Sequence, residues 1–183
     1  LNQGQIDELS RQYHFTDLLP LTPLQQGLLY HSGTARGGDD VYAMQLSLVL
    51  DGQLDPQQLR DAVQSVVDRH PHLAARFYER FDPPVQAIPA DPVVPWQYLA
   101  LDFNGTDIDG QVQEISAAER VAVGDLANRC AIRAALIRTA DERHRFILTT
   151  HHIVLDGWSM PILMQEIFAG YHGVRLPPAA SYR

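Results

Sequence analysis

The sequence predicts an α/β or α+β fold built on a mixed sheet, and three features of the chain support this fold class. Hydrophobic residues make up 45% of the 183 residues, which is enough for one globular unit with a sizeable core. Segments with helical apolar periodicity alternate with short strand-like segments. The last two strand-like segments, Ala131 to Arg138 and Arg143 to Thr150, are joined by a polar tetrapeptide and predict a hairpin. We therefore expect a central mixed sheet flanked by helices.

The first half of the chain carries start and stop signals for its elements. Thr22 followed by Pro23 marks the start of a helix, which we expect to be largely apolar and buried. Asp55 followed by Pro56 marks another helix, whose inward stripe consists of Leu59, Val63, Val66 and Val67. In chain order we expect a short helix at Gln5 to Tyr13 within a linker-like lead-in over 1–15, a helix from Leu24 to about Ser32, a loop from Ala35 to Asp40, a strand from Tyr42 to Leu50, the helix after Asp55, and a strand from Ala75 to Tyr78.

The second half begins with a proline-rich stretch. Five prolines between Phe81 and Pro95 predict loop, edge strand or short extended pieces, because proline cannot donate to a strand ladder. After it we expect an extended segment from Trp96 to Leu101, a helix from Ile108 to Leu126, the hairpin, and a last helix from Met160 to Tyr171. The helix at 108–126 has an inward face made of Val112, Ile115, Ala118 and Ala122.

Composition excludes several classes of function. The net charge of −8 argues against binding to nucleic acid or to an anionic membrane by bulk electrostatics. No apolar run approaches the roughly 20 residues that span a bilayer, and the first residues lack the pattern of a signal peptide. Cys130 is the only cysteine, so no disulfide can form within the chain, and a cytoplasmic location is expected. Cys130 begins an apolar strand, where we expect a buried, inert thiol.

The segment from Thr150 to Ser159, THHIVLDGWS, is the strongest candidate for a functional site. It lies between a predicted strand and a predicted helix, where catalytic loops are commonly mounted. His151 and His152 can hold or accept a proton near neutral pH. Asp156 follows four residues later and can approach an imidazole or pair with a distant arginine. Gly157 can adopt a positive φ or allow close backbone approach.

Two other interpretations of this segment come from the residues alone. The histidine pair at a strand end can be purely structural. A metal site is also conceivable, because His and Asp are common ligands, but no second His/Cys cluster has ligand spacing, and His70 with His72 forms only a weak pair. We therefore expect no metal. Trp158 is expected to pack its apolar face under the loop, and with Ser159 to support it.

Three motifs in the chain resemble those of the condensation domains of nonribosomal peptide synthetases. LTPLQQGLLYHS, from Leu21 to Ser32, resembles the first core motif of that family, and RHPHLAARF, from Arg69 to Phe77, resembles the second. The HHxxxDG run at His151 resembles the third, and the wider superfamily of chloramphenicol acetyltransferase and acyl-CoA-dependent acyltransferases carries the looser HxxxD. The resemblance extends over 16–183 and implies a chloramphenicol-acetyltransferase-like fold.

The resemblance also implies roles for the loop residues. His152 would lie near the acceptor amine as a base or a hydrogen-bonding positioner, and His151 would orient the loop. A backbone N–H near Gly157 would stabilise the tetrahedral oxyanion. Asp156 would shape the loop through an ion pair with an arginine of the second motif.

The arginine of that expected ion pair is displaced in this sequence. The family usually places arginine after the leucine of the second motif, and here that position is Ala74. Arg69 or Arg76 would have to pair with Asp156 instead.

The family's reaction joins a carrier-bound donor thioester to the α-amine of a carrier-bound acceptor. No cofactor would bind directly, because substrates arrive on the phosphopantetheine arms of carrier domains. The implied partners are upstream and downstream carrier domains, an adenylation domain, an epimerisation domain and a second lobe. The chain resembles the N-terminal lobe alone, because the run from Ser181 to Arg183 resembles the beginning of a fourth motif, and this lobe is expected to be inactive by itself. The first motif resembles that of domains taking a D-configured donor.

Two alternatives remain for the function. A free-standing acyl-CoA-dependent acyltransferase needs only HxxxD, so the doubled histidine and the first motif weigh against it. The second alternative is a non-catalytic module that docks carrier domains. The intact HHxxxDG motif weighs against this alternative if the chain is part of a complete condensation domain.

Overall fold

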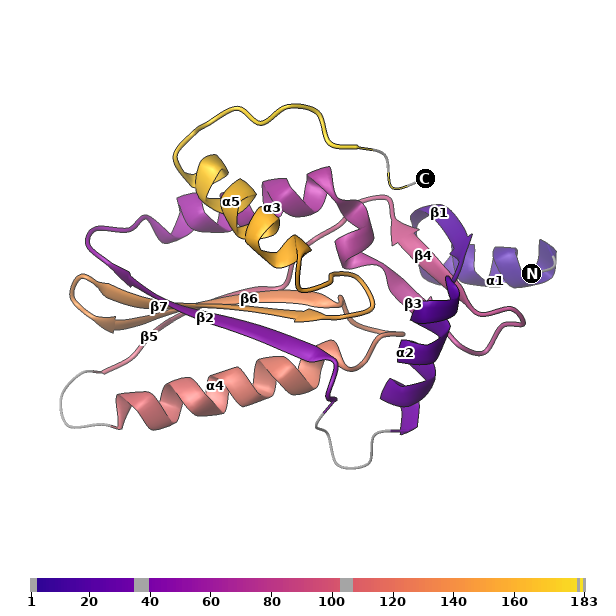
Figure 1. The fold of residues 1–183 in the computed structure, drawn as a ribbon, viewed down its shortest axis with the longest axis horizontal. Coiled ribbons are helices and arrows are strands. Elements are labelled where there is room, and N and C mark those ends of the chain that lie inside the picture. Colours follow the sequence, from indigo (N-terminus) through magenta and orange to yellow (C-terminus); the bar gives the residue numbers. More distant parts are fainter. Residues whose placement is uncertain (1–2, 35–39, 103–106, 181, 183) are drawn as a thin grey trace.

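The computed structural model describes residues 3–34, 40–102, 107–180 and 182, and it contains two separate sheets (Figure 1). The larger sheet is mixed, as the sequence predicts: β2 and β6 flank β7 in antiparallel pairing, and β5 runs parallel to β6 at the edge. Its strands are β2 (Ala43–Asp51), β5 (Trp96–Ala100), β6 (Ile132–Ala140) and β7 (Arg143–His151). The predicted hairpin is the β6–β7 pair.

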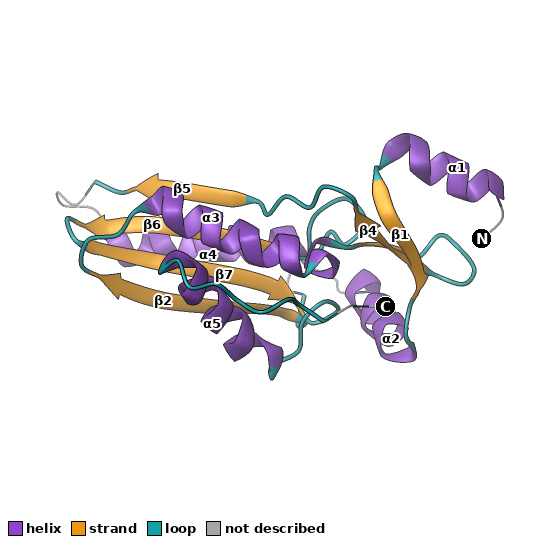
Figure 2. Cartoon of the chain, turned by 90° about the horizontal axis from the view of Figure 1, so that it is seen from above, coloured by secondary structure: helices purple, strands orange, loops and turns teal. Residues whose placement is uncertain are grey.

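Helices cover both faces of this sheet. Helices α3 (Pro56–Arg69) and α5 (Ser159–Tyr171) lie on one face and α4 (Ile108–Val123) on the other, as Figures 1 and 2 show. Strand β7 serves both layers, because alternate side chains point to opposite faces. Phe146 and Leu148 pack toward α3 and α5, whereas Ile147 packs toward α4. The three consecutive apolar residues at the centre of β7, from Phe146 to Leu148, fit this double burial.

The predicted start signals of two helices are confirmed. Asp55 caps α3, because its Oδ1 accepts hydrogen bonds from the N–H groups of Gln57 and Gln58 at 2.9 and 3.1 Å. Helix α2 (Pro23–Thr34) begins after Thr22, whose hydroxyl accepts from the Gln25 N–H at 3.2 Å. Each cap satisfies donors that the first turn of a helix leaves unpaired.

The second sheet is only partly predicted by the sequence. Its strand order is β1-β4-β3, all antiparallel, with β1 (Phe15–Pro20), β4 (Val85–Pro89) and β3 (Arg76–Tyr78). Strand β4 is the central strand of this sheet, although its proline-rich surroundings favour an edge or a loop. The prolines at 83 and 84 precede it, and Pro89 is its last residue, so the four residues from Val85 keep their N–H groups.

The lead-in over 1–15 is anchored to this second sheet. It contains α1 (Gln3–Gln12), close to the predicted helix, and the side chain of Leu9 is fully buried among Tyr78, Phe81 and Val85. The Arg76 guanidinium also lies over the ring of Tyr13, 4.3 Å from its centroid. The helix that the sequence predicts within a linker therefore belongs to the packed core of the chain.

Two predicted helical faces differ from the structure. Helix α2 is not buried all round: Leu29 is buried, but Leu24 and Tyr30 are 73% and 61% exposed. On α4, Ala118 is exposed and Glu119 is buried instead, because Arg133 of β6 donates to its carboxylate at 2.7 Å. A polar residue can occupy an inward position when an ion pair satisfies it.

Smaller differences concern the ends of elements and the single thiol. Cys130 precedes β6 rather than beginning it, and its half-buried Sγ lies 3.6 Å from the carbonyl of Val93. Burial raises the pKa of this thiol. The predicted loop at 35–40 lies, apart from Asp40, outside the described residues. Within the described part of the chain, no helix is long and apolar enough to cross a bilayer.

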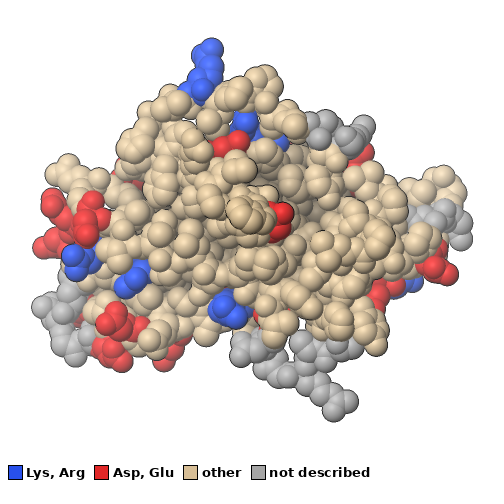
Figure 3. Space-filling model, in the orientation of Figure 1, with Lys and Arg blue, Asp and Glu red and all other residues tan. Residues whose placement is uncertain are grey.

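Charged side chains are spread unevenly over the face seen in Figure 1. Most of this face is uncharged, and acidic side chains gather mainly toward one end of the larger sheet (Figure 3). The histidine loop lies at the other end, where β7 ends beside the second sheet and Ile153 packs with Leu21, Ala75 and Phe77. The junction between the two sheets therefore carries the candidate site.

Candidate functional site

His151, the last residue of β7, is completely buried and has both ring nitrogens engaged. Its Nε2 lies 3.0 Å from Oδ2 of Asp40 and 3.0 Å from Oγ of Ser32. Its Nδ1 accepts a hydrogen bond from the N–H of Ile153 at 3.0 Å. Because a backbone N–H can only donate, Nδ1 is unprotonated and Nε2 carries the proton of a neutral ring. Burial lowers the pKa of His151, and Asp40 offsets part of that effect.

The backbone around His152 is held by one contact from a distant segment and one from the neighbouring His151. The N–H of His152 donates to the carbonyl of Tyr42 at 3.0 Å. The N–H of Ile153, the following residue, donates to Nδ1 of His151. The side chain of His152 is half-buried and lines a cavity of about 370 Å³. The two adjacent histidines are therefore not equivalent: one is buried in the fold, and the other faces the cavity.

The cavity brings together the histidine loop, the segment after α3, and α5. Two further histidines, His70 and His72, line it with His152, and so do the carboxylates of Asp156 and Glu166. The remaining lining residues are Leu73, Ile153, Val154, Leu155, Ser159, Ile162 and Leu163. The lining is therefore half apolar and half polar, and its polar groups converge on one cavity, as in many small-molecule sites.

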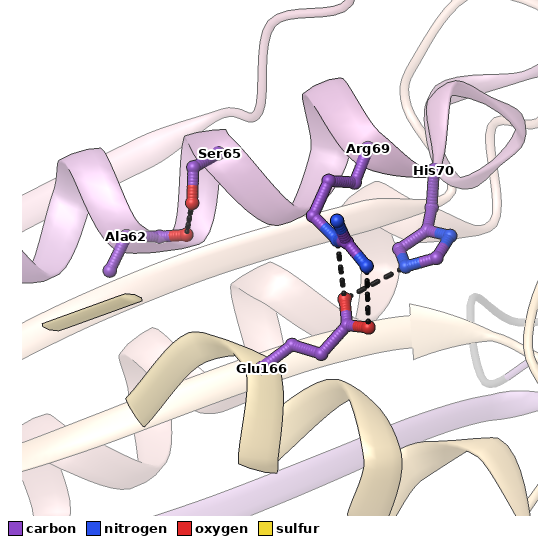
Figure 4. A network of polar contacts seen from close by, with 5 residues as sticks. All are labelled: Ala62, Ser65, Arg69, His70 and Glu166. Atoms are coloured by element: carbon purple, nitrogen blue, oxygen red, sulfur yellow. Dashed lines mark hydrogen bonds and ion pairs between the residues drawn. The ribbon is translucent and has the colours of Figure 1, made fainter. Parts of the chain in front are cut away.

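Glu166 of α5 joins the second motif to the cavity wall. Its carboxylate accepts hydrogen bonds from Nε and Nη2 of Arg69, each at 3.3 Å, and lies 2.8 Å from Nε2 of His70 (Figure 4). Burial opposes the ionisation of Glu166, but the hydrogen bonds from Arg69 and His70 outweigh it and lower the pKa of the carboxyl. The sequence offers no local signal for this contact, because the partners lie on different helices.

His72 is the most strongly perturbed histidine of the cavity. Burial, together with the nearby His70, lowers its pKa to about 4. Its ring stacks on that of Tyr182, with centroids 4.2 Å apart and planes 4° from parallel. Its buried Nδ1 has no hydrogen-bond partner among the described residues. His72 is therefore neutral near pH 7 and acts here as a planar packing surface.

The expected ion pair between Asp156 and Arg69 or Arg76 is not formed. Asp156 is exposed, and its Oδ1 accepts from the N–H of Ser159 at 2.8 Å at the start of α5. The hydrogen bond at Ser159 lowers the pKa of this carboxyl. Arg69 instead pairs with Glu166, and Arg76 lies over Tyr13.

The expectation for Trp158 is also overturned, and Gly157 does not use the positive φ that glycine allows. Trp158 does not pack under the loop, because its side chain is 89% exposed. Gly157 does not need a positive φ, which among the described glycines occurs only at Gly52 and Gly173. A Cβ built on Gly157 would meet no atom within 4 Å, so space around this residue is open in this chain.

Comparison with known proteins fixes the family. A family model described as the condensation domain matches residues 16–183. The chain belongs to the condensation domain family. Its relatives include one of the linear gramicidin synthase proteins of Brevibacillus parabrevis, 34% identical over 92% of this chain, and bacitracin synthase 3 of Bacillus licheniformis, 34% identical over 84%. The chain spans only 2% of the length of each of these two proteins.

A solved structure shows the same fold. The starter condensation domain of the rhizomide synthetase RzmA superposes with a TM-score of 0.75 at 20% identity, over 91% of this chain and 40% of that one. This likeness supports the chloramphenicol-acetyltransferase-like fold that the motifs predict for a condensation domain.

Local sequence patterns do not reveal several residues that organise the site of this condensation-domain chain. Asp40 and Glu166 hold their partners across long stretches of sequence, and nothing nearby in the chain marks them; Ser32 lies in the first motif, but the motif does not indicate its contact with His151. Gln25 is different, because Thr22-x-x-Gln25 is a capping-box pattern that the sequence does display. Among the described residues, no group of three or more His, Cys, Asp or Glu side chains could hold a metal ion.

Proposed function

We propose that the chain is the N-terminal lobe of a nonribosomal peptide synthetase condensation domain, and that it supplies the histidine loop for amide-bond formation. The donor is an acyl or peptidyl thioester and the acceptor is the α-amine of an aminoacyl thioester, each carried on a phosphopantetheine arm. Membership of the condensation domain family over residues 16–183 supports this proposal.

One observation carries the assignment of roles within the loop. His151 is buried with both ring nitrogens engaged, whereas His152 lines the cavity. Only the second histidine can therefore reach a substrate that enters the cavity. His151 acts as a positioning residue for the loop, through its contact with the N–H of Ile153.

The reaction requires the protein to position the two substrates and to assist one proton transfer. The neutral amine of the acceptor attacks the thioester carbonyl, so that a C–N bond forms and the C–S bond breaks. The amine loses a proton, and the thiol of the donor arm leaves with one. His152 accepts or hydrogen-bonds the amine proton during attack. An oxyanion forms transiently on the carbonyl and needs a backbone donor such as those near Gly157.

The partners follow from this chemistry. Two carrier domains would deliver the substrates, and a second lobe would close the cavity that is open in this chain. An adenylation domain would load the acceptor carrier. An epimerisation domain would act upstream if the donor is D-configured, as the motif at 21–32 suggests. Comparing D- and L-configured donors on the same carrier tests this subtype, and a preference for the L-donor would contradict it.

The test of the main proposal uses the complete protein with loaded donor and acceptor carriers. We expect His152→Ala to lose amide formation in single-turnover assays while keeping a normal melting temperature. His172→Ala is the matched control, because His172 is an exposed histidine at the far end of α5. Full activity of His152→Ala would overturn the role of His152. Transfer from acyl-CoA without carriers would favour a free-standing acyltransferase instead.

The lobe by itself should form no amide. Asp156 in the wall of its cavity is exposed, and so is the neighbouring Trp158. Assays of residues 1–183 alone, and after addition of a separately produced second lobe, test this expectation. Robust amide formation by residues 1–183 alone would contradict it.

A further inference from the structure

Gln25 is a buried polar side chain next to the histidine loop, and it does not line the cavity. It lies in the first turn of α2 and is only 7% exposed. Its Oε1 accepts a hydrogen bond from the N–H of Thr22 at 3.0 Å. Its Nε2 donates to the carbonyl of Ile153, the residue after His152, at 3.2 Å. The amide therefore links the cap of α2 to the candidate catalytic loop.

Chemistry fixes the orientation of this amide. The N–H of Thr22 can only donate, so the oxygen of Gln25 must face it. The carbonyl of Ile153 can only accept, so the NH₂ group of Gln25 must face the loop. Glutamine carries an acceptor and a donor on one terminal group, and glutamate, which has the same length, does so only when it is protonated.

The Gln25 contact completes a series of fixed peptide groups around His152. The N–H of His152 is held by Tyr42, the N–H of Ile153 by His151, and the carbonyl of Ile153 by Gln25. Three successive peptide groups are thus tied to three different parts of the fold. Because the backbone on both sides of His152 is held, the point from which its side chain reaches the cavity is fixed.

We propose that Gln25 is a positioning residue that holds the His152 loop in its catalytic geometry. This inference rests on the proposed function, because it concerns the placement of His152. If the donor of Gln25 is lost, the carbonyl of Ile153 is left unpaired in a residue that is only 4% exposed. A buried unpaired carbonyl favours local opening of the loop toward water.

Further hydrogen bonds tie Gln25 to the second sheet and to the end of the chain. Gln86 of β4, 3% exposed, donates from Nε2 to Oε1 of Gln25 at 3.3 Å. The hydroxyl of Tyr182 donates to Oε1 of Gln86 at 3.2 Å and accepts from Nε2 of Gln25 at 3.5 Å. Gln25, Gln86 and Tyr182 thus form a closed cycle of hydrogen bonds. This cycle connects the loop to the phenol side chain of Tyr182, which stacks on His72 in the cavity.

Two substitutions separate the positioning role from the simpler role of capping α2. Gln25→Glu keeps an acceptor for the N–H of Thr22, and Glu serves as well as Gln in a capping box. The ionised carboxylate has no donor for the carbonyl of Ile153, and the measurements are made at a pH high enough to keep it ionised, because burial favours the protonated form. Thr22→Ala does the reverse, because it removes the hydroxyl that accepts from the Gln25 N–H and keeps the donor to the loop. Gln26→Glu, the same change at the exposed next residue, controls for added charge.

The experiment compares the complete wild-type protein with these three variants. Amide hydrogen exchange over 151–158 should rise about tenfold in Gln25→Glu and stay unchanged in Gln26→Glu, since only the former loses a hydrogen bond to the loop; Gln26 donates to the carbonyl of Leu21 instead. Thr22→Ala should lower the melting temperature without faster exchange in the loop. In the condensation assay, kcat of Gln25→Glu should fall about tenfold while KM for the carrier-bound donor changes less than about twofold.

The result that overturns the proposal is unchanged exchange over 151–158 in Gln25→Glu, or a rise that is equal in all segments of the protein. Wild-type kcat in Gln25→Glu would overturn it as well. If the wild-type protein forms no amide, the proposed function fails, but the exchange comparison does not involve catalysis and still decides whether Gln25 holds the loop.

Discussion

Nε2 of His151 and Oδ2 of Asp40 lie 3.0 Å apart in the interior, where the two side chains are 0% and 8% exposed. The neutral imidazole donates to the carboxylate, and the same carboxyl group accepts from the N–H of Tyr42 through Oδ1 at 2.9 Å. Tyr42 in turn holds the N–H of His152 through its carbonyl. One aspartate therefore supports both histidines of the loop, the first directly and the second through the backbone.

Replacement of Asp40 tests this relationship. Asp40→Ala should lower the free energy of unfolding by about 1–3 kcal/mol, because it removes the acceptor of the Tyr42 N–H and leaves Oγ of Ser32 as the remaining side-chain partner of Nε2 of His151. Asp40→Asn should cost less, since its carbonyl oxygen can still accept one of these hydrogen bonds. Chemical denaturation of both variants measures the difference. A stability of Asp40→Ala equal to that of the wild type would show that the contact contributes nothing.

The buried histidines predict a loss of stability in mild acid. Burial, together with His70, lowers the pKa of His72 from 6.5 to about 4, and burial also lowers that of His151. At a pH between 4 and 6.5, these histidines bind protons in the unfolded chain but not in the folded protein. The free energy of unfolding therefore falls as the pH drops from 6.5 toward 4. Unfolding measured at a series of pH values tests this.

His72→Phe isolates the share of one histidine in that pH dependence. Phenylalanine keeps the stack on Tyr182 but does not titrate, so the fall in stability between pH 6.5 and 4 should be smaller by about 2 kcal/mol. His172→Phe, at an exposed position, should keep the wild-type pH dependence. An identical pH profile for His72→Phe and wild type would mean that His72 titrates normally.

The contact of Glu166 with Arg69 and His70 predicts a marked effect on stability. Glu166→Ala removes the shared acceptor of both side chains, and the exposed fractions of Glu166 and Arg69 are only 14% and 21%. We expect a loss of about 2 kcal/mol in the free energy of unfolding at pH 7. Asp51→Ala is the control, since Asp51 and Arg143 form an exposed pair that contributes little. Equal effects of the two substitutions would contradict this prediction.

Asp156 should contribute little to the stability of the chain. It is exposed and caps the start of α5 through the N–H of Ser159, with no arginine partner among the described residues. Asp156→Asn should leave the melting temperature unchanged, because an amide oxygen can accept the same hydrogen bond. A large drop in the melting temperature would mean that Asp156 has a buried partner after all, as the sequence motif suggests.

Much of the larger sheet and the identity of the functional loop were determined by the sequence alone. The β6–β7 hairpin, the capped start of α3 and the position of the histidine loop before α5 each depend on signals within a few neighbouring residues. Such local signals report backbone preferences that do not require knowledge of distant partners. The three motifs, in their order along the chain, also indicate the condensation domain family by themselves.

The family resemblance already assigned His152 to the substrate and His151 to the loop, but only the tertiary structure revealed which side chains hold these two histidines in place. Asp40 is 111 positions from His151, Gln25 is 128 from Ile153, and Glu166 is 97 from Arg69, so no sequence periodicity relates them. Strand β4 became a central strand for the same reason, because its partners β1 and β3 are brought to it by the fold. A buried polar group must find a partner somewhere, but which partner it finds depends on how the whole chain packs.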